Sequence, residues 1–517
     1  MIALEKADLV LHGGNVLGHP NSDTVAVASD LIIAHGRFAD LKALVGQKTR
    51  MVRLAGRTVC PGFIDCHLHF MEAAAVATGV DVTRCRRVDD LLADLRVAAG
   101  RTPAGNWLRA FGCDEALMRD HRGPIRDELD RAITRNPLRL RHQTLHASWL
   151  NSRAIAHLGL EREGFVPPDG AWLERDSAGR LTGLVAGMEE WLSRMLPFVT
   201  SAELEGRVRN FSKELAASGV TAFTDATPRN SFDDVATFAR FISSRIIGQR
   251  VNVMVGGRAL GAVADASAIN KPGLRLAGVK FTNLAQWRTD ELANQVARAI
   301  TQGLDYAFHA TEVEELEGAL NAIASGRQLA GELPGPHPIA RIEHGGVIPP
   351  DYPERIARLG VWVVTNPGFI HYRGAKYATE PGLLPYTYRS RSLIAAGVKL
   401  AAATDAPVTP GRPLTAIAAA VTRMSKDGAV LAPEERLTTN QAFDLFTRSA
   451  AEVSHLDSGV IEKGHLADLI VLPADPEKLD PAALRTLAVD MTIVGGRTIY
   501  ERGLAAGIHR ADAGRGR

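Results

Sequence analysis

The chain of 517 residues has an almost balanced charge, with 60 Lys and Arg against 58 Asp and Glu and a net charge of +2. This balance excludes a strongly basic surface, so we expect neither nucleic acid nor a membrane as a partner. The four cysteines show no CxxC spacing, and the sequence contains no recognisable signal peptide or long apolar run. These features favour the reducing cytoplasm as the location.

Short apolar runs at both ends of the chain predict a small β domain. Four runs lie between residues 7 and 54, and three lie between residues 467 and 500. Neither set has enough strands for independent stability. We therefore expect residues 1–58 and 455–505 to pair into one composite β-sandwich, and the Gly- and Arg-rich tail 506–517 to be flexible.

Between these ends, apolar runs alternate with segments of helical length. Eight runs read as strands: Val59–His69, Gly219–Asp225, Arg250–Val255, Leu274–Phe281, Leu304–His309, Pro338–His344, Val361–Thr365 and Val398–Asp405. This alternation predicts an α/β fold, with a (β/α)8 TIM barrel over residues 59–454. Between the strands, apolar residues at helical spacing predict a helix over 289–300 with Thr289 as its N-cap.

A long segment, 70–218, separates the first two predicted strands. Connections of this length in compact domains usually carry structure or function of their own. We interpret roughly residues 100–200 as an insertion after barrel strand 1, over the mouth of the barrel.

Two histidines, His67 and His69, stand at the end of the first barrel strand. Because side chains on a strand alternate between its faces, residues two apart point to the same side. Two imidazoles arranged in this way form half of a metal site. Taken alone the pair is a weak signal. With 16 histidines in a chain of this length, the number of His-X-His pairs expected by chance is about one half.

Polar residues recur at the same position in several of the predicted strands. The candidate metal ligands at these strand ends are His67, His69, Lys280, His309, His344 and Asp405. The C-terminal ends of the strands form the active face of a TIM barrel. Several imidazoles together with a carboxylate match the ligands of Zn²⁺ or another divalent metal. The competing interpretation of Lys280 is a salt-bridged lysine at a strand end.

The sequence resembles the amidohydrolase superfamily, and within it the branch that includes N-substituted formamide deformylase. The matching stretches are Pro61–His69, His146 with Asn151–Ser152, Arg341–His344, Arg391–Gly397, Ala403–Val408 and Gly459–Leu472. Together they cover nearly the whole chain.

This resemblance implies a metal centre with one or two divalent ions per chain. His67 and His69 would hold the more buried metal, and His309 and His344 would hold the second. Lys280 would bridge the two as a carbamate formed with CO₂. The resemblance also implies a homodimer.

The resemblance gives Asp405 and His146 catalytic roles. A metal lowers the pKa of the water bound to it, so that hydroxide is available near pH 7. Asp405 would bind metal, act as general base and pass the proton to the leaving amine, while His146 would donate a hydrogen bond to the oxyanion. The predicted reaction is hydrolysis of a linear amide or related C–N bond in a small molecule.

Two departures from this branch leave a one-metal site open. After Lys280 the chain reads Phe281-Thr-Asn283, where the branch commonly has an acidic Asp-Gly element. After His309 it reads Ala310-Thr-Glu-Val-Glu314, where the branch usually has Ile-Gly-Asp. A single metal would use His67, His69 and Asp405. Either His309 or His344 would be the fourth ligand.

Other functions fit the same residues. A heterocycle deaminase or a cyclic-amide hydrolase would use the same metal chemistry, and an esterase or lactonase differs only in its leaving group. An alternative of another class is a non-catalytic barrel scaffold. Loss of ligands would favour the scaffold, but all six candidate positions carry ligating residues.

Overall fold

The structure is a computed structural model that describes residues 6–76, 79–144, 146–196, 201–262, 269–332 and 338–503. The chain divides into two compact units. The first consists of Met1–Leu68, Ser212–Asp405 and Thr409–Arg517, and the second consists of His69–Phe211 and Ala406–Val408. The tail predicted to be flexible, 506–517, lies outside the described residues.

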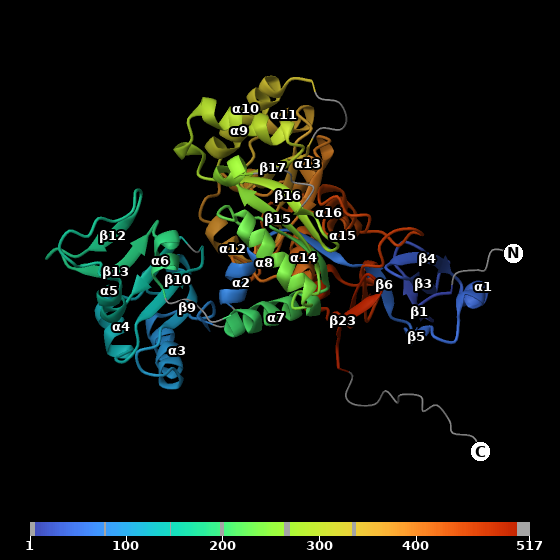
Figure 1. Ribbon diagram of the computed structural model, residues 1–517, viewed down its shortest axis with the longest axis horizontal. Coiled ribbons are helices and arrows are strands. Elements are labelled where there is room, and N and C mark those ends of the chain that lie inside the picture. Colours follow the sequence, from blue (N-terminus) through green and yellow to red (C-terminus); the bar gives the residue numbers. More distant parts are fainter. Residues whose placement is uncertain are drawn as a thin grey trace, which may run out of the picture. The chain divides into compact units, whose positions relative to one another are not determined.

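An eight-stranded parallel sheet forms the centre of the first unit (Figure 1). Its strands follow one another in chain order: β7 (Phe63–Leu68), β14 (Val220–Asp225), β15 (Arg250–Gly256), β16 (Leu274–Phe281), β17 (Asp305–Ala310), β18 (Ala340–His344), β19 (Trp362–Thr365) and β20 (Leu400–Ala402). Nearly all of their residues are buried, as is usual for parallel strands. The predicted (β/α)8 barrel is confirmed.

Helices alternate with these strands. They are α8 (Phe232–Ser243), α9 (Thr289–Thr301), α10 (Val313–Ala330), α11 (Tyr352–Arg358), α12 (Gly368–Tyr377), α13 (Ser390–Ala395), α14 (Pro413–Thr422), α15 (Thr439–Asp444) and α16 (Arg448–Val453). The prediction of Thr289 as an N-cap is wrong, because α9 begins at this residue and Arg288 precedes it without a side-chain cap. In place of a side-chain cap, the acidic side chains of Asp290 and Glu291 in the first turn stabilise the positive end of the helix dipole.

Hydrogen bonds join β7 and the end of β20, which are the two edges of the sheet. The carboxylate of Asp65 accepts hydrogen bonds from the Thr404 hydroxyl and from the Thr404 backbone N–H at 3.0 Å. The backbone N–H of Asp405 donates to the carbonyl of His67 at 2.9 Å. These bonds close the barrel and bring two predicted metal ligands to one point of its rim.

Strands from both ends of the chain form a β-sandwich in the same unit, drawn in blue and red in Figure 1. One sheet has the order β4 (Leu31–Gly36), β3 (Thr24–Ala28), β1 (Leu9–His12), β5 (Arg50–Arg53). The other has the order β2 (Asn15–Val16), β6 (Thr58–Pro61), β21 (Leu469–Leu472), β22 (Met491–Val494), β23 (Arg497–Glu501). Both sheets contribute to one buried apolar cluster, which includes Leu11, Val27, Leu469 and Ile493. The composite sandwich of the predicted fold class is confirmed.

A six-stranded mixed sheet forms the second unit. Its order is β12 (Trp172–Arg175), β13 (Leu181–Ala186), β11 (Ala147–Leu150), β10 (Leu138–His142), β9 (Leu108–Cys113), β8 (Val80–Asp81). Its helices are α2 (Phe70–Val76), α3 (Val88–Arg101), α4 (Arg126–Ala132), α5 (Ser152–Leu158) and α6 (Glu189–Met195), and α7 (Ser201–Ala217) contains the boundary between the units. The predicted insertion after the first barrel strand is confirmed, while the domain boundaries given above stay a proposal.

None of the described helices combines the length and the apolar character that a membrane span requires.

The first predicted strand, Val59–His69, is divided in the structure into β6 of the sandwich and β7 of the barrel. Gly62 lies between them. A Cβ atom added at this glycine would lie 2.2 Å from Cγ2 of Thr221 on the neighbouring barrel strand. The sandwich therefore passes into the barrel at a point where no side chain fits.

The Gly62→Ala substitution is expected to lower the free energy of unfolding by about 1–3 kcal/mol, because the backbone must shift to admit the methyl group. Gly382→Ala is the matched control, since an added Cβ there meets no atom within 4 Å among the described residues beyond its two chain neighbours. Denaturant unfolding of both variants measures the difference. Equal stability of the two variants would contradict the close packing at Gly62.

Candidate metal centre

Five of the predicted site residues lie together at the C-terminal ends of the barrel strands. They are His67 on β7, Lys280 on β16, His309 on β17, His344 on β18, and Asp405 just beyond β20. The ring centroids of His67 and His344 are 4.9 Å apart, and those of His309 and His344 are 4.7 Å apart. The Nε2 atom of His67 lies 3.5 Å from Oδ1 of Asp405. All of these side chains are buried except that of His309, which is partly buried.

Asn366, which follows β19, orients the ring of His344. Its Nδ2 donates to the carbonyl of Ala403 at 3.1 Å, so its Oδ1 faces Nδ1 of His344 at 2.7 Å. The ring must then carry its proton on Nδ1, because an amide oxygen only accepts. Nε2 keeps its lone pair and faces Nδ1 of His309 at 3.1 Å. A partner of this kind fixes the tautomer of a metal-binding histidine.

The backbone is unusual at two of these positions. His344 has a φ of 72° and Asp405 has a φ of 60°, both in the left-handed region that non-glycine residues seldom adopt. Regular strand alternation would place His344 on the face opposite to Glu343, and the positive φ ends that alternation at the tip of β18. Residues held in this conformation concentrate at functional sites.

Glu343 connects the site to a buried arginine. Its carboxylate accepts from Nε of Arg341 at 2.7 Å and from Nη2 at 3.1 Å, and it contacts Nδ1 of His67. Nζ of Lys280 lies 3.9 Å from the same carboxylate. Glu343 and Arg341 were not predicted to take part in the site. Two charged residues two apart within a buried strand were the available signal.

Burial keeps the imidazoles of the site neutral. It lowers the pKa of His67 to about 3, and it also lowers the pKa values of His309 and His344. Burial acts to raise the pKa of Glu343, but the charges of Arg341 and Lys280 and the contact with His67 hold it well below its usual value. The site thus offers neutral nitrogen ligands beside an anionic carboxylate.

Lys280 has the surroundings that carbamate formation requires. Its side chain is buried, and no hydrogen-bond partner for Nζ is found among the described residues. Burial lowers its pKa to about 8, which raises the share of neutral amine that can react with CO₂. A carbamate would replace a poorly satisfied cation with anionic oxygen ligands. Together with the neutral imidazoles and Asp405, this residue fits a divalent metal.

His69 and His146 belong to the second unit. His69 is bonded directly to Leu68 at the end of β7, and its backbone N–H donates to the carbonyl of Ala406 at 2.8 Å. His146 is exposed, and its carbonyl accepts from the N–H of Gly187 at 3.2 Å. The roles of His69 as a ligand and of His146 in oxyanion binding stay predictions.

Asn366→Ala is expected to weaken metal binding about 10- to 100-fold, because the ring of His344 loses the partner that fixes its tautomer. Asn294→Ala is the control, since that exposed amide donates to the carbonyl of Asp290 in its own helix. Competition with a chromophoric chelator measures both affinities. Unchanged affinity in Asn366→Ala would show that His344 is not a ligand or does not depend on this partner.

The fold places the chain in a class of barrel proteins that includes solved structures described as metal-dependent hydrolases. An uncharacterized metal-dependent hydrolase from Pyrococcus horikoshii OT3 aligns with a TM-score of 0.71 and 21% identity, covering 92% of this chain and 99% of that one. A second, from Pyrococcus furiosus, aligns with a TM-score of 0.68 and 22% identity over 91% of this chain and 100% of that one. At these identities the likeness shows the fold.

The chain belongs to the amidohydrolase family, whose model matches residues 50–500. It is also similar to N-substituted formamide deformylase of Arthrobacter pascens, with 26% identity over 530 residues that cover 93% of this chain and 95% of the relative. The resemblance stated from the sequence is thereby confirmed. Membership of this family makes the protein a hydrolase.

Proposed function

We propose that this protein is a metal-dependent amidohydrolase that cleaves a linear amide or related non-peptide C–N bond in a small molecule. The observation that carries the proposal is the convergence of His67, His344 and Asp405 beside Lys280 and His309 at the barrel rim. Family membership supports hydrolysis. Similarity to a deformylase of N-substituted formamides supports a linear amide as the substrate class.

The proposed cofactor is Zn²⁺ or another divalent ion, one or two per chain. The residues that would hold it are His67, His69, Lys280 as its carbamate, His309, His344 and Asp405. When bound, the metal would lower the pKa of water and polarise the substrate carbonyl.

Asp405 is the proposed general base. Its carboxylate lies beside the ring of His67, and its backbone N–H is bonded to the carbonyl of the same residue, so the carboxylate is held at the rim. It takes a proton from the attacking water as the oxygen bonds to the carbonyl carbon, and it returns that proton to the nitrogen as the C–N bond breaks. The products are a carboxylic acid and an amine. His146 is proposed to donate a hydrogen bond to the oxyanion.

Glu343 is proposed to hold the ring of His67, and Arg341 in turn holds the carboxylate of Glu343. Because Glu343 accepts from Nδ1 of His67, Nε2 of that ring keeps a lone pair toward Asp405 and the rim. We further propose a cytoplasmic homodimer that acts on a small-molecule amide and binds neither nucleic acid nor membranes.

The reaction class is tested by incubating zinc-loaded protein with three sets of compounds. These are N-alkyl formamides and acetamides, cyclic amides, and amino-substituted heterocycles. We expect amine and carboxylate to appear in equal amounts from the linear amides, and not from Asp405→Asn. Release of ammonia from the heterocycles alone would show a deaminase, and ring opening alone would show a cyclic-amide hydrolase. No turnover of any set would favour the scaffold.

A further inference from the structure

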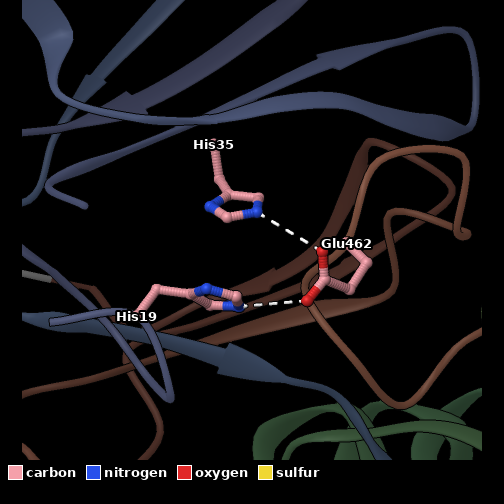
Figure 2. A group of neighbouring side chains, drawn as sticks. All are labelled: His19, His35 and Glu462. Carbon is pink, nitrogen blue, oxygen red and sulfur yellow. Dashed lines mark ion pairs between the residues drawn. The ribbon is translucent and has the colours of Figure 1, made fainter. Parts of the chain in front are cut away.

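A second cluster of metal-ligating side chains lies in the β-sandwich, on segments that the barrel site does not use. It consists of His19, His35 and Glu462 (Figure 2). His19 lies between β2 and β3, His35 lies on β4, and Glu462 lies in the segment that leads to β21. The cluster therefore combines residues from the two ends of the chain.

Both imidazoles present Nε2 to one carboxylate, as Figure 2 shows. Nε2 of His19 lies 3.8 Å from Oε1 of Glu462, and Nε2 of His35 lies 3.5 Å from Oε2. One ligand atom from each of the three residues lies within 4.8 Å of the others. Metal–ligand bonds of about 2.0–2.1 Å in a tetrahedral zinc site place neighbouring ligand atoms roughly 3.3 Å apart. Small movements of the three side chains would meet that geometry.

The carboxylate is free to make this adjustment. The side chain of Glu462 is 54% exposed, whereas the side chains of His19 and His35 are each 23% exposed. Both nitrogen–oxygen distances are longer than an ordinary hydrogen bond of about 2.7–3.2 Å. Two half-buried imidazoles thus flank an exposed carboxylate without bonding to it closely.

The two imidazole rings lie against each other. Their centroids are 4.1 Å apart, so two imidazolium cations would repel each other. Burial, and then the neighbouring ring of His35, lowers the pKa of His19. The hydroxyl of Ser22 lies 3.2 Å from Nδ1 of His35, where it can accept a hydrogen bond from Nδ1–H, a tautomer that leaves Nε2 with its lone pair.

We propose that His19, His35 and Glu462 bind a divalent transition-metal ion of the zinc type, with water completing its coordination. The ion would join the loop after β2 and strand β4 to the segment before β21. It would thereby stabilise the pairing of the two chain ends in the sandwich. The proposal is independent of the barrel site and of the reaction proposed above.

Equilibrium dialysis against Zn²⁺ tests the proposal on the full chain. The proteins are the wild type, His35→Ala, Glu462→Gln and the control His12→Ala, which removes a histidine of the same sandwich that stacks on Phe38. At equal free zinc we expect His35→Ala and Glu462→Gln to bind one ion fewer than the wild type and the control. Zinc should also raise the unfolding temperature of the wild type and the control more than that of the two cluster variants.

Each variant is compared with its own metal-free form, so a change in intrinsic stability does not decide the outcome. Amide hydrolysis should be retained in all four proteins, because none of the substitutions touches the barrel rim. Equal zinc binding and equal thermal response in all four would overturn the proposal. The cluster would then be an ion-pair group in which the histidines serve only the packing of the sandwich.

Discussion

Replacement of Asp405 by asparagine is expected to reduce kcat/KM for amide hydrolysis by about 10³-fold or more, since a general base alone contributes about 10²–10⁴-fold. The amide of asparagine occupies the same space but cannot take a proton from water. The substitution also removes the proposed carboxylate ligand from a site whose histidines are neutral. The measurement is the rate of amine release from the N-alkyl formamide or acetamide that the wild-type protein hydrolyses fastest.

Asp290→Asn is the matched control, because the carboxylate of Asp290 is exposed and pairs with exposed Arg288. The unfolding temperature of Asp405→Asn should stay near that of the wild type, which separates lost chemistry from lost structure. Retention of more than about a tenth of the wild-type rate would exclude Asp405 as the general base, given the usual size of that contribution.

Glu343→Gln is expected to lower the free energy of unfolding by about 3–5 kcal/mol, the usual cost of leaving one partner of a buried ion pair without the other. Arg341 is fully buried, and its guanidinium makes two hydrogen bonds to this carboxylate. The ring of His67 loses the group that fixes its tautomer. Metal affinity should therefore fall together with stability.

Glu317→Gln separates this effect from the general loss of an ion pair. Glu317 pairs with Arg355 at 2.6 Å, but both side chains are partly exposed. Exposed pairs contribute about 0–1 kcal/mol. Denaturant unfolding and chelator competition compare the two variants. A loss in Glu343→Gln that does not exceed the loss in Glu317→Gln would contradict the role of Glu343 as the central anion of the site.

The barrel was predictable from the sequence because parallel strands buried on both faces are continuous apolar runs. The boundary between the sandwich and the barrel could not be recognised from the same apolar runs. Val59–His69 reads as one strand, yet the chain leaves the sandwich and enters the barrel at Gly62. The reason is the side chain of Thr221, about 160 residues later in the sequence, which occupies the space where a Cβ would stand. The sequence pattern around Gly62 cannot predict a contact with a residue so far away along the chain.

The candidate site was likewise predictable only in part. Alternation along the first barrel strand predicts that His67 and His69 share a face, and the strand ends indicate where His309 and Lys280 lie. The partners that orient them come from other strands, as Glu343 does for His67 and Asn366 does for His344. Strand alternation predicts the side of the sheet to which a side chain points. It does not predict which side chain from another strand will contact it. The positive φ values of His344 and Asp405 were likewise invisible in the sequence.

The metal content per chain tests the central claim most directly. Elemental analysis is made on protein purified without added metal, with His35→Ala in every sample so that the sandwich cluster does not contribute. Lys280→Ala is compared with Lys399→Ala, whose exposed amine pairs with Glu452 on the surface. We expect about two equivalents in the parent and in Lys399→Ala, as in two-metal hydrolytic sites. In Lys280→Ala we expect about one or fewer, with activity lost. One equivalent in the parent that is unchanged in Lys280→Ala would show that Lys280 is structural and that the site holds a single metal, as in a deaminase-like hydrolase. A parent protein that holds no metal, even after zinc is added, would contradict the account.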